Sequence, residues 1–181
     1  SEVEEIIKEN RRTLERDRRE VEKVIEENKR SLEEIERKVR EIIKDNDRSA
    51  KEITELAKAG VPRKDLKRFL EEDKRRVEKV LDELRKLLEE DRRKVEEALR
   101  KSEKTLREDE RRAREVIRRI DDEELVDRLR KSLRDVREES KKLIDELRRS
   151  LEESDRRVKE LIDRLRKSLD DSRKLVDDLR R

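Results

Sequence analysis

An 18-residue repeat runs through almost the whole chain and limits the folds that it can adopt. The first third reads VEEIIKENRRTLERDRRE, VEKVIEENKRSLEEIERK and VREIIKDNDRSAKEITEL, starting at Val3, Val21 and Val39. Related repeats fill the middle third, as in EEDKRRVEKVLDELRKLL, and the last third, as in LIDELRRSLEESDRRVKE. Eighteen residues make five turns of an α-helix, so the apolar positions return to one face without drifting. The repeat therefore predicts long, nearly straight amphipathic helices.

Two short breaks divide the repeat into three helices. Gly60 and Pro62 in LAKAGVPRKDL are typical of a helix end followed by a helix start. In IRRIDDEEL, Asp121 precedes Glu124 by three residues, the spacing of a capping box, and Ser1 with Glu4 has the same spacing. We expect one helical-bundle domain, 1–181, with helices near 2–58, 62–119 and 122–181 and turns near 59–61 and 120–121.

Short connections make consecutive helices antiparallel, so the predicted fold is all-α, an up-down-up bundle. Each helix is expected to be roughly 85 Å long at 1.5 Å per residue. The apolar positions cover about 120° of each helical wheel, enough to face two neighbours. Such a stripe fits a closed bundle of three helices and also three-quarters of a four-helix bundle.

The composition excludes several classes of protein. Charged residues make up 61% of the chain and hydrophobic residues only 29%, a composition that is typical of disordered chains. Two features argue against disorder here. The charges of 57 basic and 54 acidic residues nearly cancel, and the apolar residues have a helical periodicity. Because Cys and His are absent, the usual metal, haem and triad sites lack their ligands or base, and we expect no cofactor. No apolar run is long enough to span a membrane or to act as a signal peptide. We therefore expect a soluble chain without a targeting signal, consistent with recombinant expression in a cytoplasm.

Polar residues recur inside the apolar stripes at the same place in each repeat. If the chain folds back at its two breaks, facing residues have numbers with a constant sum, 119 across the first break and 241 across the second. Half of each sum is the position at which the chain reverses direction, and both positions lie within a predicted turn. The alignment predicts three buried hydrogen-bond layers, which are Asn10–Asp109–Ser132, Asn28–Asp91–Ser150 and Asn46–Asp73–Ser168.

Three exceptions to the repeat predict a fourth polar layer. Asp17, Ser102 and Ser140 each replace an apolar residue, and they fall at one level of the folded chain. A single polar residue in an apolar stripe is more often a surface-edge residue, but four aligned layers favour buried networks, since a buried polar group needs a partner. Oxygen ligands in a layer could also hold a hard cation, although Ca²⁺ takes six to eight of them.

The charged surface does not indicate a nucleic acid or membrane partner. Pairs of arginines are interleaved with acidic residues three or four positions away, which favours surface ion pairs over a one-sided basic patch. Apart from Phe69, no aromatic residue is present to stack on bases. We expect no nucleic acid, membrane or small-molecule partner.

The uninterrupted Glu/Arg/Lys/Asp surface, the capping boxes, the untwisted 18-residue repeat and the Asn–Asp–Ser layers resemble those of de novo designed parametric helical bundles. The resemblance covers the whole chain. Within that group, the chain is similar to designed heterodimers in which three linked helices accept a separate fourth. A long charged single helix or a spectrin-like rod fits less well.

Two functions remain, of which the polar layers and the low apolar fraction favour the first, and catalysis is not expected from either. In the first, the three helices form an interaction and assembly module with a groove for an amphipathic helix, a helical protein or a second copy. Its buried polar layers would then set specificity by penalising wrong partners and registers. In the second, the chain is a self-contained monomeric scaffold without a partner.

Overall fold

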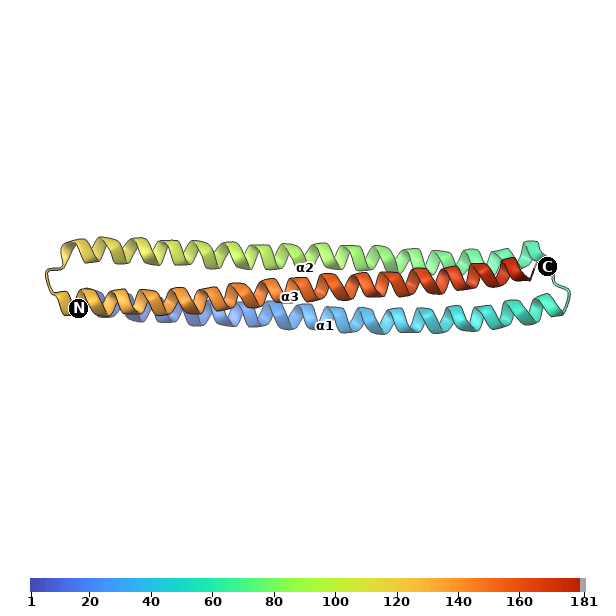
Figure 1. Ribbon diagram of the computed structural model, residues 1–181, viewed down its shortest axis with the longest axis horizontal. Helices are drawn as coiled ribbons and strands as arrows, with labels where there is room; N and C mark the ends of the chain where they lie inside the picture. Colours follow the sequence, from blue (N-terminus) through green and yellow to red (C-terminus); the bar gives the residue numbers. More distant parts are fainter. Residues whose placement is uncertain (180–181) are drawn as a thin grey trace. The chain divides into compact units, whose positions relative to one another are not determined.

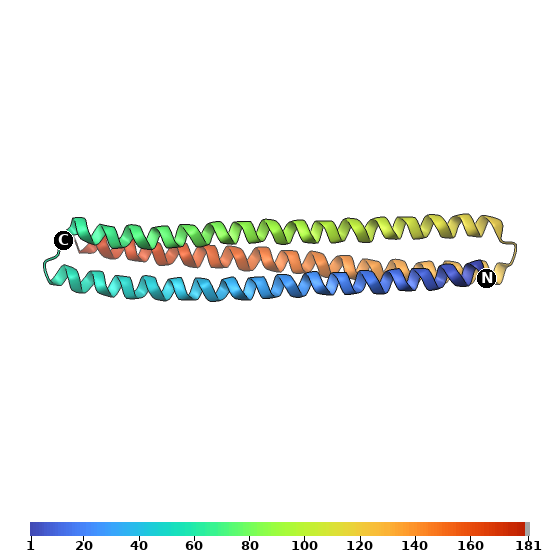
Figure 2. The same cartoon turned by 180° about the vertical axis from the view of Figure 1, so that it is seen from behind.

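Three helices account for nearly all of residues 1–179, the part of the chain that the computed structural model describes. Helix α1 spans Glu2–Lys58, α2 spans Arg63–Arg119 and α3 spans Glu123–Asp178, and these described residues contain no strand. Figures 1 and 2 show the two short connections between the helices. The predicted all-α fold is confirmed, with α2 and α3 each starting one residue later than expected. The predicted end of the third helix at 181 lies outside the described residues.

The first connection ends α1 with a left-handed residue. Gly60 has φ of 86°, a backbone conformation that side chains with a Cβ rarely adopt. Val61 N donates a hydrogen bond to Leu56 O at 3.0 Å, and Gly60 N donates one to Ala57 O at 3.2 Å. These two bonds form a Schellman motif, which satisfies carbonyl groups at the helix end. The carbonyl of Pro62 then accepts the first bond of α2.

Side-chain caps mark the other helix starts. Glu4 N donates to Ser1 Oγ at 3.3 Å, as the spacing predicts. At α3 the prediction is wrong by one residue, because Glu124 N donates to Asp122 Oδ1 at 3.0 Å rather than to Asp121. The carbonyl of Asp122 also accepts from Val126 N, the first bond of α3. Asp122 is therefore the N-cap, and its side chain reaches the second helical N–H.

The chain forms two compact units, and each contains a segment of every helix. Unit 1 consists of Ser1–Asn28 and Asp91–Glu152. Unit 2 consists of Lys29–Glu90 and the segment that begins at Glu153. That residues 1–181 form one domain stays a prediction.

In unit 1, cross-helix ion pairs give the direction of the helices. Along α1 from its N-terminus, the residue numbers of its partners in α2 decrease, so α1 and α2 are antiparallel. The residue numbers of its partners in α3 increase, so α1 and α3 are parallel. The pairs are Glu9–Arg112, Glu27–Lys94, Glu4–Arg128 and Arg18–Glu139. Two apolar clusters form the core, one around Val3, Ala113 and Leu129 and one around Val21, Val95 and Leu147.

Unit 2 has the same up-down-up order. Its α1 segment pairs with α2 through Lys38–Glu83 and Asp45–Arg76, and with α3 through Glu36–Arg157. One apolar cluster surrounds Val39, Leu84 and Leu165. The other surrounds Ile53, Leu66 and Val176, with the ring of Phe69 packed against it.

Burial follows the 18-residue repeat. Val3, Val21 and Val39 are each 1% exposed, and Leu129, Leu147 and Leu165 are fully buried. Among residues 1–179, Leu179 is the one large hydrophobic side chain that is exposed, at 37%. The apolar stripes are therefore covered within each unit.

Candidate functional site

The repeated polar residues lie in the interior of both units. The three asparagines of α1 and the three aspartates of α2 are all buried, namely Asn10, Asn28, Asn46, Asp73, Asp91 and Asp109. The serines of α3 at the corresponding levels, Ser132, Ser150 and Ser168, are half-buried. The position of each residue in the helical repeat determines how deeply its side chain is buried. The hydrogen bonds, by contrast, differ from level to level.

In unit 2, Asn46 contacts the serine of its level, and Asp73 contacts other residues. Asn46 Nδ2 donates to Ser168 Oγ at 3.1 Å. Arg76 Nη2 donates to Asp73 Oδ1 at 2.5 Å, and the Ser49 hydroxyl also donates to this carboxylate. Asn46 Oδ1 and Asp73 Oδ2 are buried and have no hydrogen-bond partner in residues 1–179. This level therefore has two acceptors without a donor.

In unit 1, Asn28 contacts the aspartate of its level. The Asn28 amide is oriented by its neighbours, so that its nitrogen donates to Asp91 Oδ1 at 3.2 Å and to Val24 O at 3.3 Å. Ser150 lies half-buried on α3. The amide here bonds to α2, whereas Asn46 bonds to α3.

At the third level, also in unit 1, the amide nitrogen has no partner in residues 1–179 and the aspartate has a raised pKa. Asn10 Nδ2 is buried without a hydrogen-bond partner among the described residues. Burial raises the pKa of Asp109 to about 6, against the opposing effect of Arg112. The negative charges of Glu9, Asp17 and Glu108 add to the increase. Residues 1–179 contain no side-chain hydrogen bond from Asn10 to Asp109 or Ser132.

The residues of the predicted fourth layer lie in unit 1 as well. Ser102 and Ser140 are buried, and Asp17 is half-buried. Burial raises the pKa of the Asp17 carboxyl, and Glu20 raises it further. Within the described part of the chain, no hydrogen bond joins the three side chains.

Three further buried serines escape the sequence argument. Ser49, Ser154 and Ser172 are all at most 8% exposed. The Ser172 hydroxyl donates to Ser168 O on its own helix at 3.1 Å, whereas the Ser49 hydroxyl bonds to Asp73. Ser49 follows Asn46 by three residues, so it lies on the same face of α1. That spacing is the signal that could have identified it.

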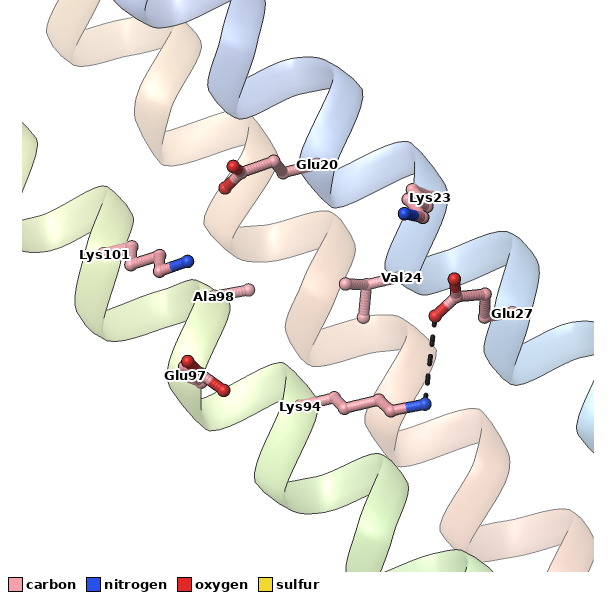
Figure 3. A pocket seen from close by; sticks show the side chains of 8 residues that line it. All are labelled: Glu20, Lys23, Val24, Glu27, Lys94, Glu97, Ala98 and Lys101. Carbon is pink, nitrogen blue, oxygen red and sulfur yellow. Dashed lines mark ion pairs between the residues drawn. The ribbon is translucent and has the colours of Figure 1, made fainter.

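A surface hollow of about 230 Å³ lies between α1 and α2 in unit 1 (Figure 3). Val24 and Ala98 line it together with charged side chains, and the Glu27–Lys94 ion pair of 3.8 Å crosses one end. The corresponding positions in the other repeats hold larger residues, which are Ile6, Ile42, Val80 and Val116. The hollow therefore results from two small residues at one level.

Ion pairs on the surface repeat at the same position of successive repeats. α1 contributes the acid and α2 the base in Glu9–Arg112 at 2.8 Å, Glu27–Lys94 at 3.8 Å and Asp45–Arg76 at 4.0 Å. Pairs as exposed as these contribute about 0–1 kcal/mol each. They favour one register of the helices more than they stabilise the fold.

Two absences among the described residues bear on the class of site. Residues 1–179 contain no group of three or more His, Cys, Asp or Glu side chains placed to hold a metal ion. Within the same residues, no helix is both long and apolar enough to cross a membrane.

The chain is similar in structure to a protein described as a computationally designed three helix bundle. The two share 23% sequence identity and a TM-score of 0.58, over 98% of this chain and 79% of the other. This chain is a three-helix bundle. No protein-family model matches the bundle. No curated protein matches it either.

Proposed function

We propose that this three-helix bundle is a designed, self-contained scaffold that keeps its fold without a partner and catalyses no reaction. The observation that carries the proposal is the burial of the apolar stripes. Of the large hydrophobic side chains in residues 1–179, Leu179 alone is exposed. A site for a helical partner normally offers a contiguous apolar patch of several hundred Å².

The designed origin is supported by the regularity of the chain. The 18-residue repeat is kept in all three helices, and each helix start or end described above has a cap of the expected type. The similar structure is itself described as computationally designed.

The mass of the pure chain in solution tests the scaffold proposal. Light scattering or sedimentation over a wide range of concentrations should give one species of 22.2 kDa. The fluorescence of a dye that binds exposed apolar surfaces should not increase when the protein is added. A dimer, or a mass that rises with concentration, would overturn the proposal.

A second candidate, an interaction module, is favoured by the unpaired polar atoms. Asn10 Nδ2, Asn46 Oδ1 and Asp73 Oδ2 are buried without a partner among residues 1–179. Each such atom costs about 1–3 kcal/mol. In this candidate, a partner helix enters lengthwise and its polar side chains complete the Asn–Asp–Ser layers. Helices without matching polar groups would be rejected.

A separate peptide with the sequence of residues 123–178 distinguishes the two candidates, because it has an apolar stripe and the three layer serines. The module predicts a one-to-one complex and changed amide signals at Asn10 and Asn46. The scaffold predicts neither. A control peptide with Ser132, Ser150 and Ser168 replaced by alanine tests the role of the layers, since equal binding of both peptides would exclude specificity through hydrogen bonds.

A further inference from the structure

The polar level at Asn46 in unit 2 leaves two buried acceptors without a donor. These are Asn46 Oδ1 and Asp73 Oδ2, neither of which has a partner within residues 1–179. The amide nitrogen of Asn46 donates to Ser168 Oγ on α3 at 3.1 Å, so its oxygen points away from that hydroxyl. Buried acceptors rarely stay unpaired in folded proteins.

Neighbouring contacts put Asp73 and Asn46 at the same level of unit 2. Arg76 Nη2 lies 2.5 Å from Asp73 Oδ1, and Arg76 Nη1 lies 4.0 Å from Asp45 Oδ2 on α1. The hydroxyl of Ser49, also on α1, lowers the pKa of Asp73 through a hydrogen bond. Asn46 follows Asp45 directly and shares a helix face with Ser49. The two unpaired oxygens therefore belong to one buried cluster.

The chemistry of the three side chains allows two complete arrangements. A carboxylate only accepts hydrogen bonds, but a protonated carboxyl also donates one. An amide can turn over and exchange its donor for its acceptor, and a serine hydroxyl can donate as well as accept. A proton on Asp73 and a turned amide of Asn46 are thus alternative ways to satisfy the same atoms.

We propose that Asp73, Asn46 and Ser168 form a proton-coupled hydrogen-bond switch with two states. In the acid state, Asp73 Oδ2–H donates to Asn46 Oδ1, and Asn46 Nδ2 donates to Ser168 Oγ. In the basic state, the proton has left Asp73 for solvent and the amide has turned over. Asn46 Nδ2 then donates to Asp73 Oδ2, and the Ser168 hydroxyl donates to Asn46 Oδ1. The two oxygens are paired in both states.

The surrounding charges determine where the switch operates. Burial raises the pKa of Asp73 and Glu72 raises it further, whereas the Ser49 hydrogen bond and Arg76 lower it, with a net increase. On α1, Asp45 shares Arg76 with Asp73. On the α3 side, Ser168 lines a hollow whose charged residues are Asp47, Arg164, Lys167 and Asp171. The transition is therefore expected above the ordinary carboxyl pKa of about 3.9.

Two nuclear magnetic resonance probes of the full chain test the switch during one pH titration. The carboxyl carbon of Asp73 should titrate with a midpoint above about 3.9. The side-chain amide signals of Asn46 should shift with the same midpoint. The proposal is wrong if the Asn46 amide does not follow Asp73, as when a water molecule bridges the two oxygens. It is also wrong if Asp73 titrates at or below the ordinary value.

A neutral variant provides a second test. Asp73→Asn supplies a permanent donor toward Asn46, so the Asn46 amide signals should no longer depend on pH. Persistence of the Asn46 titration in this variant would overturn the proposal. The control is Asp45→Asn, which removes the other partner of Arg76 and should leave the coupled titration in place. If Asp73→Asn does not fold, the coincidence of the two midpoints in the unmodified chain still decides.

Discussion

Asn46 Nδ2 donates to Ser168 Oγ across 3.1 Å, between residues 122 positions apart in the chain. The bond joins α1 to α3 inside unit 2, where Asn46 is 1% exposed. In this arrangement the Ser168 hydroxyl is, among the described residues, the one partner of the buried amide donor of Asn46.

Replacing Ser168 by alanine should therefore destabilise unit 2. With Asp73 protonated, the Asn46 donor would be left buried and unpaired, at a cost of about 1–3 kcal/mol. Denaturant unfolding measures this loss. Ser132→Ala is the matched control, because Asn10 Nδ2 has no partner in residues 1–179 even with the serine present. Equal losses in the two variants would show that the bond to Ser168 contributes nothing.

The layer at Asn28 should respond differently to single and combined changes. Asn28→Leu removes an amide that donates to Asp91 Oδ1 at 3.2 Å, and the buried carboxylate then has one donor fewer. We expect a loss of roughly 1–3 kcal/mol. Replacing Asn28, Asp91 and Ser150 together by apolar residues of matching volume should recover that loss. If both changes are harmless in denaturant melts, the layer does not contribute to the folded state.

Unit 1 should lose stability as the pH rises through the titration of Asp109. Its folded pKa is about 6 and its ordinary value is 3.8, so the folded state holds the proton more tightly than the unfolded state. The stabilising effect is complete below pH 3.8, declines as the pH rises and is lost above about 6. The shift corresponds to about 3 kcal/mol as an upper limit.

Asp109→Asn should remove this dependence and make unit 1 more stable at pH 7 than the unmodified chain. Chemical denaturation at a series of pH values measures the difference. The control is Glu108→Gln, an exposed neighbour, which should keep most of the dependence. A pH profile unchanged by Asp109→Asn would contradict the assignment.

Replacing Gly60 should destabilise the fold because of the backbone conformation at this position. A Cβ at this position would meet no atom within 4 Å, so packing does not oppose Gly60→Ala. Its φ of 86° does, and we expect a loss of about 1–2 kcal/mol. Asn tolerates this conformation better, so thermal or denaturant unfolding should rank the variants Gly, then Asn, then Ala. Equal stability of Gly60→Ala would show that the turn adapts.

Filling the hollow beside Val24 should stabilise unit 1. Ala98→Val restores the residue found at the corresponding positions of the repeat and covers part of the 230 Å³ hollow. Partial burial of the added methyl groups should contribute about 1 kcal/mol. Ala113→Val is the contrasting variant, because Ala113 is 0% exposed and added volume there should cost about 1–3 kcal/mol. The opposite order of the two stabilities would refute this account.

The helices and most of their ends could be read from the sequence, because each follows from local chemistry. The 18-residue period fixes the apolar face, and Gly60 supplies the left-handed residue that ends α1. The sequence does not distinguish Asp121 from Asp122 as the cap of α3, because the two are adjacent and chemically alike. Only the path of the backbone shows which one reaches Glu124 N.

The hydrogen bonds of the layers could not be read in the same way. Asn28 and Asn46 follow nearly the same apolar pattern, yet one donates to an aspartate of α2 and the other to a serine of α3. The direction of an amide depends on which neighbours occupy the acceptors, and at Asp73 these include Arg76 and Ser49. Such contacts depend on side-chain rotamers, which the repeat does not specify.

Phe69 gives unit 2 a spectroscopic label that unit 1 lacks. It is the only aromatic residue in the sequence, and its ring packs against the cluster of Ile53, Leu66 and Val176. Aromatic proton signals, and the ring-current shifts of nearby methyl groups, therefore come from one cluster alone. Melting followed at these signals reports on unit 2, while circular dichroism averages over every helix. The difference between the two curves would reveal whether the units unfold together.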